Sequence, residues 1–281
     1  MMKPDVRGFF DPVTATWTYV VRGEDEKKCA VIDSVLDYDP ASGHTSTVSA
    51  DQVISFIKER NLEVEWILET HIHADHLTAS QYLKQKLGGR TAISKHILNV
   101  LKTWLPIFGT EADTPADGSQ FDHLFEDDEM FSIGKLDARI IHTPGHTPAD
   151  TTYILGDAAF VGDAMFLPDV GTGRCDFPGA SAADSYESAQ KILSLPNDFR
   201  IYTAHDYPPN GARGAQCMTT VAEQKVGNIA INVKITRDVF IKNRTTADKG
   251  KSVPPLLLPS LQVNLRAGII GDYIKIPVNK I

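Results

Sequence analysis

Three of the nine histidines in the chain fall within six consecutive positions, in the segment His71-Ile72-His73-Ala74-Asp75-His76. The segment follows residues 65–70, a short apolar-rich run that predicts a strand. Residues two apart on an extended backbone point the same way, so His71 and His73 can present both imidazoles to one point. Asp75 and His76 can then face a neighbouring point. Imidazoles and carboxylates are typical metal ligands, so this segment predicts a strand that ends at one or two adjacent metal positions.

One segment cannot complete a metal site, so further ligands must come from other parts of the chain. Three candidates are His146, in a Pro-Gly turn, Asp163 and His205. Each follows a strand-like run, and these runs are 137–141, 159–161 and 200–203. Loops that leave the edge of a sheet often carry functional side chains. Each residue alone would fit a cap or a turn, but their shared context makes them candidate ligands.

Strand-like and helical segments alternate along the chain, which is typical of an α/β protein. Further strands are predicted at 16–21 and 29–32, which read as a hairpin, and at 151–155 and 273–278. Helices are predicted from about 51 to 61 and at 77–87, 181–195 and 219–231. The first helix follows Ser49-Ala50-Asp51-Gln52, which has the form of a capping box. Residues 103–128 predict a long surface excursion, and residues 248–259 predict a loop.

Composition excludes several classes of function. The formal charge of -8 disfavours nucleic acid and anionic membranes as partners, because both require a basic surface. No stretch approaches the roughly 20 apolar residues of a membrane span. Three scattered cysteines argue against a disulfide framework. We therefore expect a soluble, cytoplasmic protein that binds no nucleic acid and no membrane.

Four motifs together resemble those of the metallo-beta-lactamase superfamily. They are His71-x-His73-x-Asp75-His76, Pro144-Gly145-His146-Thr147, Gly162-Asp163 and Ala204-His205-Asp206-Tyr207. The resemblance implies an α/β fold, a four-layer αββα sandwich with the metal site at one edge of the paired sheets. It leads us to expect a single domain over residues 1–281, with a C-terminal extension from about residue 208.

Two groups of enzymes in that superfamily carry all seven candidate positions. Glyoxalase II-type thioester hydrolases hold two metals with them, whereas persulfide dioxygenases, also called sulfur dioxygenases, hold a single iron through three. The segments Gly162-Asp163-Ala164-Met165-Phe166 and Gly173-Arg174-Cys175-Asp176-Phe177 resemble motifs of the persulfide dioxygenases. The tail at 258–268 resembles that of their longer bacterial members.

The resemblance to persulfide dioxygenases implies a specific site. Its iron ligands would be His71, His146 and Asp163, with one Fe(II) per chain. The other four positions would surround an unused second metal position and hydrogen-bond the ligands or water; they are His73, Asp75, His76 and His205. The implied reaction adds both atoms of O₂ to the terminal sulfur of glutathione persulfide, and water then releases sulfite and glutathione.

The same resemblance suggests residues that meet the substrate. Tyr207 would lie near the iron, where its hydroxyl could orient the reactants, and packing is the plainer interpretation of this residue. Arg174 would bind a glutathione carboxylate, because a planar guanidinium can grip a carboxylate through two hydrogen bonds; a structural ion pair with Asp169 or Asp176 is the alternative. Thr147, beside the ligand His146, would also contact substrate. A homodimer is a further expectation.

Two other functions stay open at this point. A dinuclear thioester hydrolase would cleave S-lactoylglutathione without oxygen. A non-catalytic binding module is the more distant alternative, and a module of that kind has no chemical need for seven metal-binding side chains.

Overall fold

Successive side chains on the first strands point to opposite faces of the sheet, and each face packs against a different layer of the molecule. The computed structural model, which describes residues 3–281, pairs β2 (Thr16–Gly23) with β3 (Lys28–Ile32) in antiparallel register, with Tyr19 opposite Ile32. Tyr19 and Ile32 point into a core between two sheets, whereas Val20 and Val31 pack on the other side, against helices. Burying such a side chain contributes about 1.5–3 kcal/mol. The predicted hairpin at 16–21 and 29–32 is therefore confirmed.

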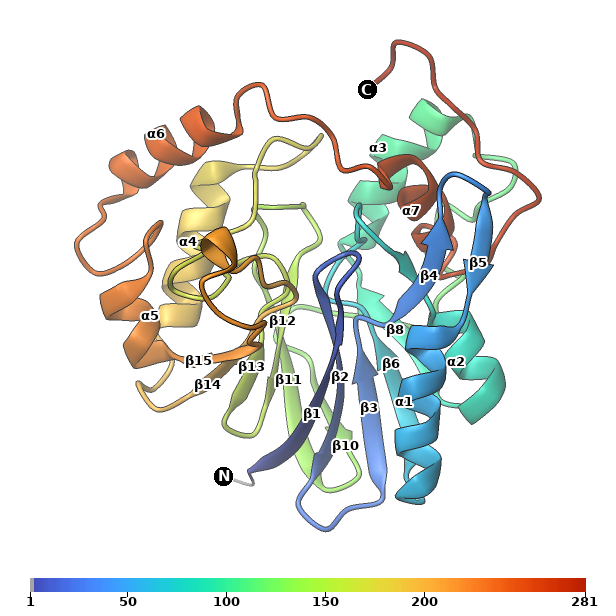
Figure 1. Ribbon diagram of the computed structural model, residues 1–281, viewed down its shortest axis with the longest axis horizontal. Coiled ribbons are helices and arrows are strands. Elements are labelled where there is room, and N and C mark those ends of the chain that lie inside the picture. The colour runs from blue at the N-terminus through green and yellow to red at the C-terminus, as the bar shows by residue number, and fades with distance from the viewer. Residues whose placement is uncertain (1–2) are drawn as a thin grey trace.

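Two six-stranded sheets face each other at the centre of the molecule (Figure 1). In spatial order the first comprises β1 (Pro4–Asp11), β2, β3, β6 (Glu63–Leu68), β8 (Arg90–Ser94) and β9 (His123–Phe125). The second comprises β10 (Met130–Ile133), β11 (Leu136–His142), β12 (Thr151–Leu155), β13 (Ala158–Phe160), β14 (Arg200–Tyr202) and β15 (Met218–Thr220). A small third sheet comprises β5 (His44–Ser46), β4 (Val35–Asp39) and β7 (Leu77–Thr78).

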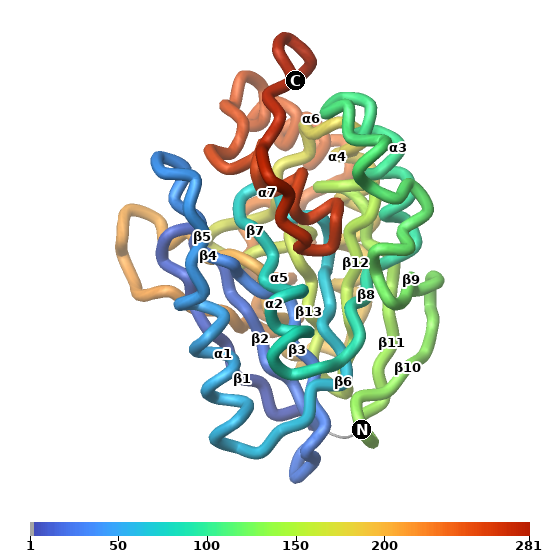
Figure 2. The backbone as a smooth tube through the Cα atoms, turned by 90° about the vertical axis from the view of Figure 1, so that its right-hand side faces the viewer, coloured from blue at the N-terminus to red at the C-terminus, as the bar shows by residue number. Residues whose placement is uncertain are grey.

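Helices cover the outer faces of both sheets (Figures 1 and 2). On the side of the first sheet lie α1 (Val48–Glu59), α2 (Ser80–Leu87), α3 (Ile97–Phe108) and α7 (Leu257–Asn264). On the side of the second sheet lie α4 (Ala182–Leu193), α5 (Val221–Gly227) and α6 (Arg237–Asp248). A 3₁₀ turn at Pro209–Gly211 precedes β15. The order helix, sheet, sheet, helix is the expected four-layer αββα sandwich. Within residues 3–281, no helix combines the length and the apolar character that crossing a bilayer requires.

The start of α1 differs from the predicted capping box. The helix begins at Val48, so Ser49 lies in its first turn and does not cap it. Asp37 of β4 takes the capping role instead, accepting hydrogen bonds from the Ser49 backbone N–H at 2.9 Å and the Ser49 hydroxyl at 2.6 Å. A carboxylate from a neighbouring strand satisfies the free N–H groups at a helix start as well as a local side chain does.

The predicted surface excursion at 103–128 is partly wrong. Its first residues belong to α3, which buries Trp104, Leu105 and Phe108, and His123–Phe125 forms β9. Pro106 near the end of α3 and Gly109, at φ +62° just after it, gave the segment its loop-like composition. Proline in the last turn shortens a helix without preventing it, and glycine readily adopts the left-handed conformation that ends it.

The C-terminal region also differs from its prediction. The helix predicted at 219–231 is shorter in the structure, where α5 is confined to Val221–Gly227. Only a loop was predicted at 248–259, whereas α6 ends at Asp248 and α7 begins at Leu257, with a short connection between them. Pro259 fits α7 because it lies in the first turn, where backbone N–H groups have no helical partner. The strand predicted at 273–278 is wrong, since this alternating apolar segment has no neighbouring strand to pair with and forms no regular structure.

Candidate metal centre

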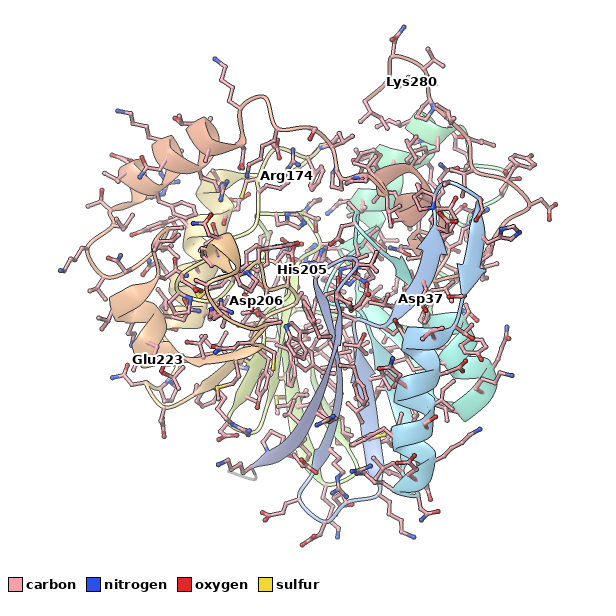
Figure 3. All side chains as sticks on the ribbon, viewed as in Figure 1. Asp37, Arg174, His205, Asp206, Glu223 and Lys280 are labelled. Carbon is pink, nitrogen blue, oxygen red and sulfur yellow. The ribbon has the colours of Figure 1, made fainter. Side chains whose placement is uncertain are left out.

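Loops at one edge of the two sheets bring the seven candidate ligands together. His71, His73, Asp75 and His76 follow β6 of the first sheet, and the other three follow β11, β13 and β14 of the second: His146, Asp163 and His205. Six of the seven are buried, and Asp75 is partly exposed. His205 lies near the centre of the molecule, where these loops meet (Figure 3).

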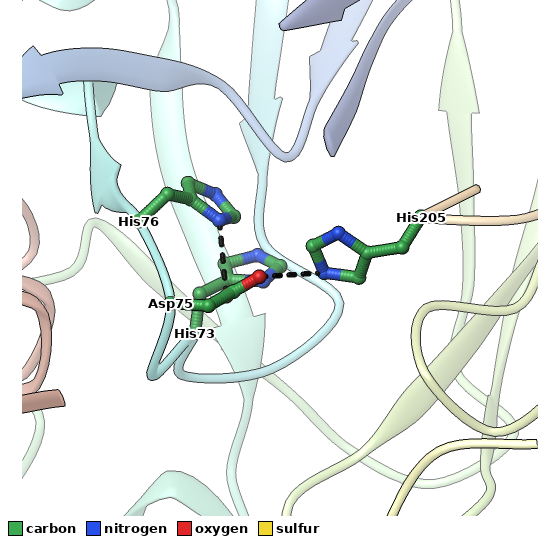
Figure 4. A group of neighbouring side chains, drawn as sticks. All are labelled: His73, Asp75, His76 and His205. Carbon is green, nitrogen blue, oxygen red and sulfur yellow. Dashed lines mark hydrogen bonds and ion pairs between the residues drawn. The ribbon is translucent and has the colours of Figure 1, made fainter. Parts of the chain in front are cut away.

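The seven side chains form two groups, each with potential ligand atoms within 4.8 Å of one another. We call His71, His146 and Asp163 the trio. We call His73, Asp75, His76 and His205 the quartet. Within the quartet, Asp75 lies between two histidines, 3.2 Å from His76 Nδ1 and 3.1 Å from His205 Nε2 (Figure 4). The quartet and the trio adjoin at Asp163, whose Oδ1 is 3.5 Å from His205 Nε2.

In the trio, one ring nitrogen of each histidine is engaged by an oxygen atom outside the cluster. His71 Nδ1 lies 3.0 Å from Thr70 Oγ1, and that hydroxyl donates to Asp33 at 2.8 Å, so it accepts the His71 N–H. His146 Nδ1 donates to the Arg174 carbonyl at 2.8 Å. Each hydrogen bond sets the tautomer and leaves a lone pair on Nε2. Burial, with the nearby His73 and His146, also lowers the pKa of His71 well below its ordinary value, which keeps that imidazole neutral.

In the quartet, two of the three histidines are likewise engaged by oxygen atoms outside the cluster. His73 Nε2 lies 3.1 Å from Asp33 Oδ1, and His205 Nδ1 lies 3.3 Å from the Ala15 carbonyl. His76 Nδ1 lies 3.2 Å from Asp75 within the quartet itself. The opposite nitrogens of these three rings, His73 Nδ1, His76 Nε2 and His205 Nε2, are buried without a hydrogen-bond partner. Bonds of this kind to the far side of an imidazole are typical of metal-ligating histidines.

Buried atoms without hydrogen-bond partners provide a test of whether the cluster fits a metal. Within the described chain, four such atoms belong to it: His73 Nδ1, His76 Nε2, Asp163 Oδ1 and His205 Nε2. Leaving a buried polar atom unpaired costs about 1–3 kcal/mol. Four together, all imidazole nitrogens or carboxylate oxygens, are the donor set of a transition-metal cation, so the residues fit a bound metal.

Two residues that sequence reasoning missed hold the second histidine of the cluster. Asp33 follows β3, and Glu69 follows β6; Asp33 lies 3.1 Å and Glu69 3.4 Å from His73 Nε2. Burial lowers the pKa of His73, but the two carboxylates outweigh it and raise this pKa well above its ordinary value. The sequence signal was present, since each acid directly follows an apolar strand, much as Asp163 comes three positions after the end of β13.

Gly162 allows the two sheets to approach at the site. Its φ of +53° lies in the left-handed region, and a Cβ there would come within 2.7 Å of Thr70 Oγ1. A larger side chain would therefore push Asp163 away from the loop that carries His71. The Gly162-Asp163 motif thus has a steric reason.

The comparisons with known proteins agree with this geometry. The sequence model of the metallo-beta-lactamase superfamily matches residues 11–205, more than half of the chain. The protein is a member of the metallo-beta-lactamase superfamily. Proteins of this superfamily bind metals, and the cluster at the sheet edge is the candidate metal site of this member.

Individual relatives of this metallo-beta-lactamase superfamily member carry different names. Glyoxylase B2 of Dictyostelium discoideum is 50% identical over 99% of this chain and 98% of its own. The human mitochondrial persulfide dioxygenase ETHE1 is 28% identical over 94% of this chain and 89% of its own. The crystal structure of ETHE1 from Myxococcus xanthus superposes with a TM-score of 0.75 at 25% identity, covering 94% of this chain and 100% of that one. Both a glyoxalase and a dioxygenase name therefore occur among its relatives.

A cavity of about 340 Å³ opens at the metal site of this superfamily member. Three candidate ligands line it, Asp75, His146 and Asp163, and the rest of its wall includes Phe166, Thr172, Arg174, Phe177, Tyr207, Arg244 and Lys251. A larger, shallower hollow of about 640 Å³ lies between Leu167 and Gly227, but it contains none of the candidate ligands. The smaller cavity is therefore the candidate substrate pocket, because it adjoins the candidate ligands.

Of the predicted substrate contacts, Arg174 lines the cavity and Thr147 does not. Arg174 forms the structural ion pair that the sequence left as the alternative, with two bonds to Asp176 at 2.6 and 2.7 Å and a third to the Ser252 carbonyl. The Thr147 hydroxyl donates a hydrogen bond to the carboxylate of buried Asp150. It therefore braces the turn that carries His146, and its orientation is explained without a substrate.

Tyr207 lines the cavity beside the cluster. Its ring stacks on His205, with centroids 5.6 Å apart, and meets the edge of Phe166. Desolvation, together with the charges of Asp75 and Asp163, raises the pKa of Tyr207 well above its ordinary value. The hydroxyl thus stays protonated and can donate a hydrogen bond into the cavity.

Proposed function

We propose that the protein is an Fe(II)-dependent persulfide dioxygenase, which oxidises glutathione persulfide with O₂ and water to sulfite and glutathione. The observation that carries the proposal is the trio. His71, His146 and Asp163 gather their ligand atoms within 4.8 Å, while His73 belongs to the quartet and is bonded to Asp33. Two histidines and one carboxylate on one side of a metal are the ligand set of non-heme Fe(II) oxygenases.

The trio would hold the iron, and Fe(II) bound there would supply the redox chemistry for a reaction with O₂, which Zn(II) cannot supply because it has no accessible redox change. The chain supplies position and shielding. His146 and Asp163 line the cavity, and Phe166 and Phe177 add apolar side chains to its wall. Apolar walls exclude water from the reacting sulfur and strengthen polar interactions beside it.

The cationic part of the cavity lining suits a glutathione moiety. Arg174, Arg244 and Lys251 all line the cavity in a protein of net charge -8, and glutathione carries two carboxylates. All three cations already have carboxylate partners: Arg174 is paired with Asp176, and Arg244 and Lys251 are both paired with Asp248. Lys251 is the most accessible of the three, with 43% of its side chain exposed, so its ammonium is the group best placed to meet an incoming carboxylate.

The relatives support the proposal at the level of their names. A persulfide dioxygenase is similar over 94% of this chain, and the ETHE1 structure of Myxococcus xanthus is covered completely. The Tyr207 hydroxyl, protonated and beside the cluster, then acts as a hydrogen-bond donor toward the bound reactants.

A thioester hydrolase is the second candidate, and two observations favour it. The 50% identical relative is named Glyoxylase B2. Three of the four unpaired buried atoms belong to the quartet, and a second metal ion there would satisfy them. Two metals and an activated water would then hydrolyse S-lactoylglutathione.

The experiment that separates the two candidates is a paired substrate assay on anaerobically prepared, iron-loaded protein. A persulfide dioxygenase consumes O₂ and releases sulfite with glutathione persulfide and leaves S-lactoylglutathione intact. Hydrolysis of S-lactoylglutathione without oxygen uptake, at a rate typical of an enzyme, would overturn the proposal in favour of the hydrolase. His71→Ala is the control, because it should abolish either activity.

A further inference from the structure

We propose that Asn264, in the C-terminal helix α7, is a positioning residue for the loop that carries the metal-binding histidines. It lies outside residues 11–205, the part of the chain that matches the superfamily. The inference concerns the loop that either candidate reaction would use, so it does not depend on which of the two the protein catalyses.

The Asn264 side chain closes the ligand loop by hydrogen bonds to its backbone. Its Nδ2 donates to the carbonyl of His73 at 2.8 Å and to that of His76 at 2.9 Å, and its Oδ1 accepts from the Thr78 N–H at 2.8 Å. Both N–H bonds of the amide are therefore used, and the two carbonyls lie on either side of Asp75. One amide thus fixes the backbone that carries three of the four quartet residues.

The rest of α7 prevents Asn264 from moving away. Leu257, Leu261 and Leu265 pack in one apolar cluster with Ile72 and Ala74, the residues that separate the ligands along the loop. Asn264 itself is 2% exposed, so water cannot replace its hydrogen bonds. The helix therefore supports the loop through an apolar face and a single buried amide.

The chain just beyond α7 is attached to the same region. The Ser80 hydroxyl donates to the Ala267 carbonyl at 2.8 Å, and Gly268, at φ +89°, approaches Ser80 so closely that a Cβ would lie 3.0 Å from its hydroxyl oxygen. This contact holds the start of α2, the helix that follows the ligand loop. Both ends of the segment from His73 to Ser80 are thus held by the C-terminal region.

Gln262 provides a matched control on the same helix. It is 4% exposed, and its amide also donates two hydrogen bonds, to the carbonyls of Leu258 and Lys275, and accepts one from the Lys275 N–H. None of these partners belongs to the ligand loop. Gln262→Glu therefore loses the same kind of bonds as Asn264→Asp, with the same change of charge, at a place that does not touch the metal site.

The test measures Co(II) binding to metal-free protein by competition with a chelator, together with the visible absorption of the bound Co(II). In Asn264→Asp a carboxylate oxygen replaces the donor to two carbonyls, so the loop should lose its shape. We expect Co(II) affinity to fall about 10- to 100-fold and the absorption bands to change, as for other groups that orient metal ligands. Gln262→Glu should keep the affinity and the spectrum of the original protein.

Equal losses of affinity in the two variants, or an unchanged affinity and spectrum in Asn264→Asp, would overturn the proposal. Asn264→Ser keeps one donor and removes the repulsion, so it covers the case in which Asn264→Asp does not fold. This variant should bind Co(II) with an affinity between those of the original protein and Asn264→Asp. An affinity in Asn264→Ser equal to that of the original protein would also contradict the proposal. Because the readout is metal binding, a failure of the proposed dioxygenase reaction would leave this result unaffected.

Discussion

His73 Nε2 and Asp33 Oδ1 lie 3.1 Å apart, and both side chains are buried. The same carboxylate accepts the Thr70 N–H and hydroxyl, each at 2.8 Å, and the hydroxyl in turn accepts from His71. Asp33, which directly follows β3 of the first sheet, is therefore linked by hydrogen bonds to two histidines of the cluster. One carboxylate at the end of β3 sets the orientation of both rings.

Asp33→Asn tests this connection. An amide can keep some of the hydrogen bonds but removes the nearer of the two carboxylates beside His73 and leaves only Glu69, and breaking a buried charged pair costs about 3–5 kcal/mol. We expect urea unfolding of the metal-free variant to show a loss of that size. Asp198→Asn, at an exposed position, should change the unfolding free energy by about 0.5 kcal/mol or less. A similar small change in Asp33→Asn would contradict the role given to this residue.

The trio and the quartet can be tested separately through their carboxylates. Asp163→Asn removes the charged ligand of the trio and should reduce bound iron to a small fraction of one per chain. Asp75→Asn changes the quartet and should leave most of the iron in place. Metal analysis of both variants after anaerobic loading measures this difference. Equal loss of iron in the two variants would show that the groups act as one binuclear site.

Lys251→Ala tests the substrate end of the cavity. Removing one accessible cation should raise KM for glutathione persulfide about threefold to tenfold, in line with a partly screened charge contact, with little change in kcat. The effect should weaken as salt is added. Lys249→Ala removes an exposed charge two residues away that does not line the cavity, and its KM should match that of the original protein. An unchanged KM in Lys251→Ala would exclude this contact.

Asp248→Asn should destabilise the protein in a pH-dependent way. Burial raises the pKa of Asp248, but bonds from Arg244, the Cys175 N–H and Lys251 outweigh it and lower this pKa below its ordinary value. The carboxylate therefore stabilises the folded state at pH values above about 4, the pKa of an aspartate in the unfolded chain. This stabilisation is lost as the pH falls through the pKa of Asp248 in the folded protein. Unfolding free energies should differ by about 2–4 kcal/mol at pH 7, and the difference should shrink below about pH 4. A difference that stays constant between pH 7 and pH 3 would contradict the explanation.

Local patterns predicted most of the sandwich and all of the candidate ligands. The hairpin at 16–32 and the strands before His71, Asp163 and His205 have short apolar runs, and such runs predict a strand from the local sequence alone. The three ligand positions outside the first segment were identifiable because each follows a strand. Helix α7 was missed because Pro259 in its first turn and its mixed polarity hid the helical pattern.

Other features of the site depend on contacts between distant residues. Asp33 and Glu69 became visible only when the strands placed them against His73. Asn264 lies 191 positions from His73 along the chain, and no local sequence pattern predicts that its side-chain amide donates a hydrogen bond to the His73 carbonyl. Arg174 was predicted to be available to substrate, and only the folded loop shows that Asp176 and Ser252 already use its guanidinium.

Iron stoichiometry together with oxygen uptake tests the central claim most directly. Metal-free protein is titrated with Fe(II) under anaerobic conditions, and the loaded protein is then mixed with glutathione persulfide in an oxygen electrode. The account predicts one iron per chain, lost in His71→Ala, and one O₂ consumed for each sulfite released. Two metal ions per chain, with no oxygen uptake, would contradict it.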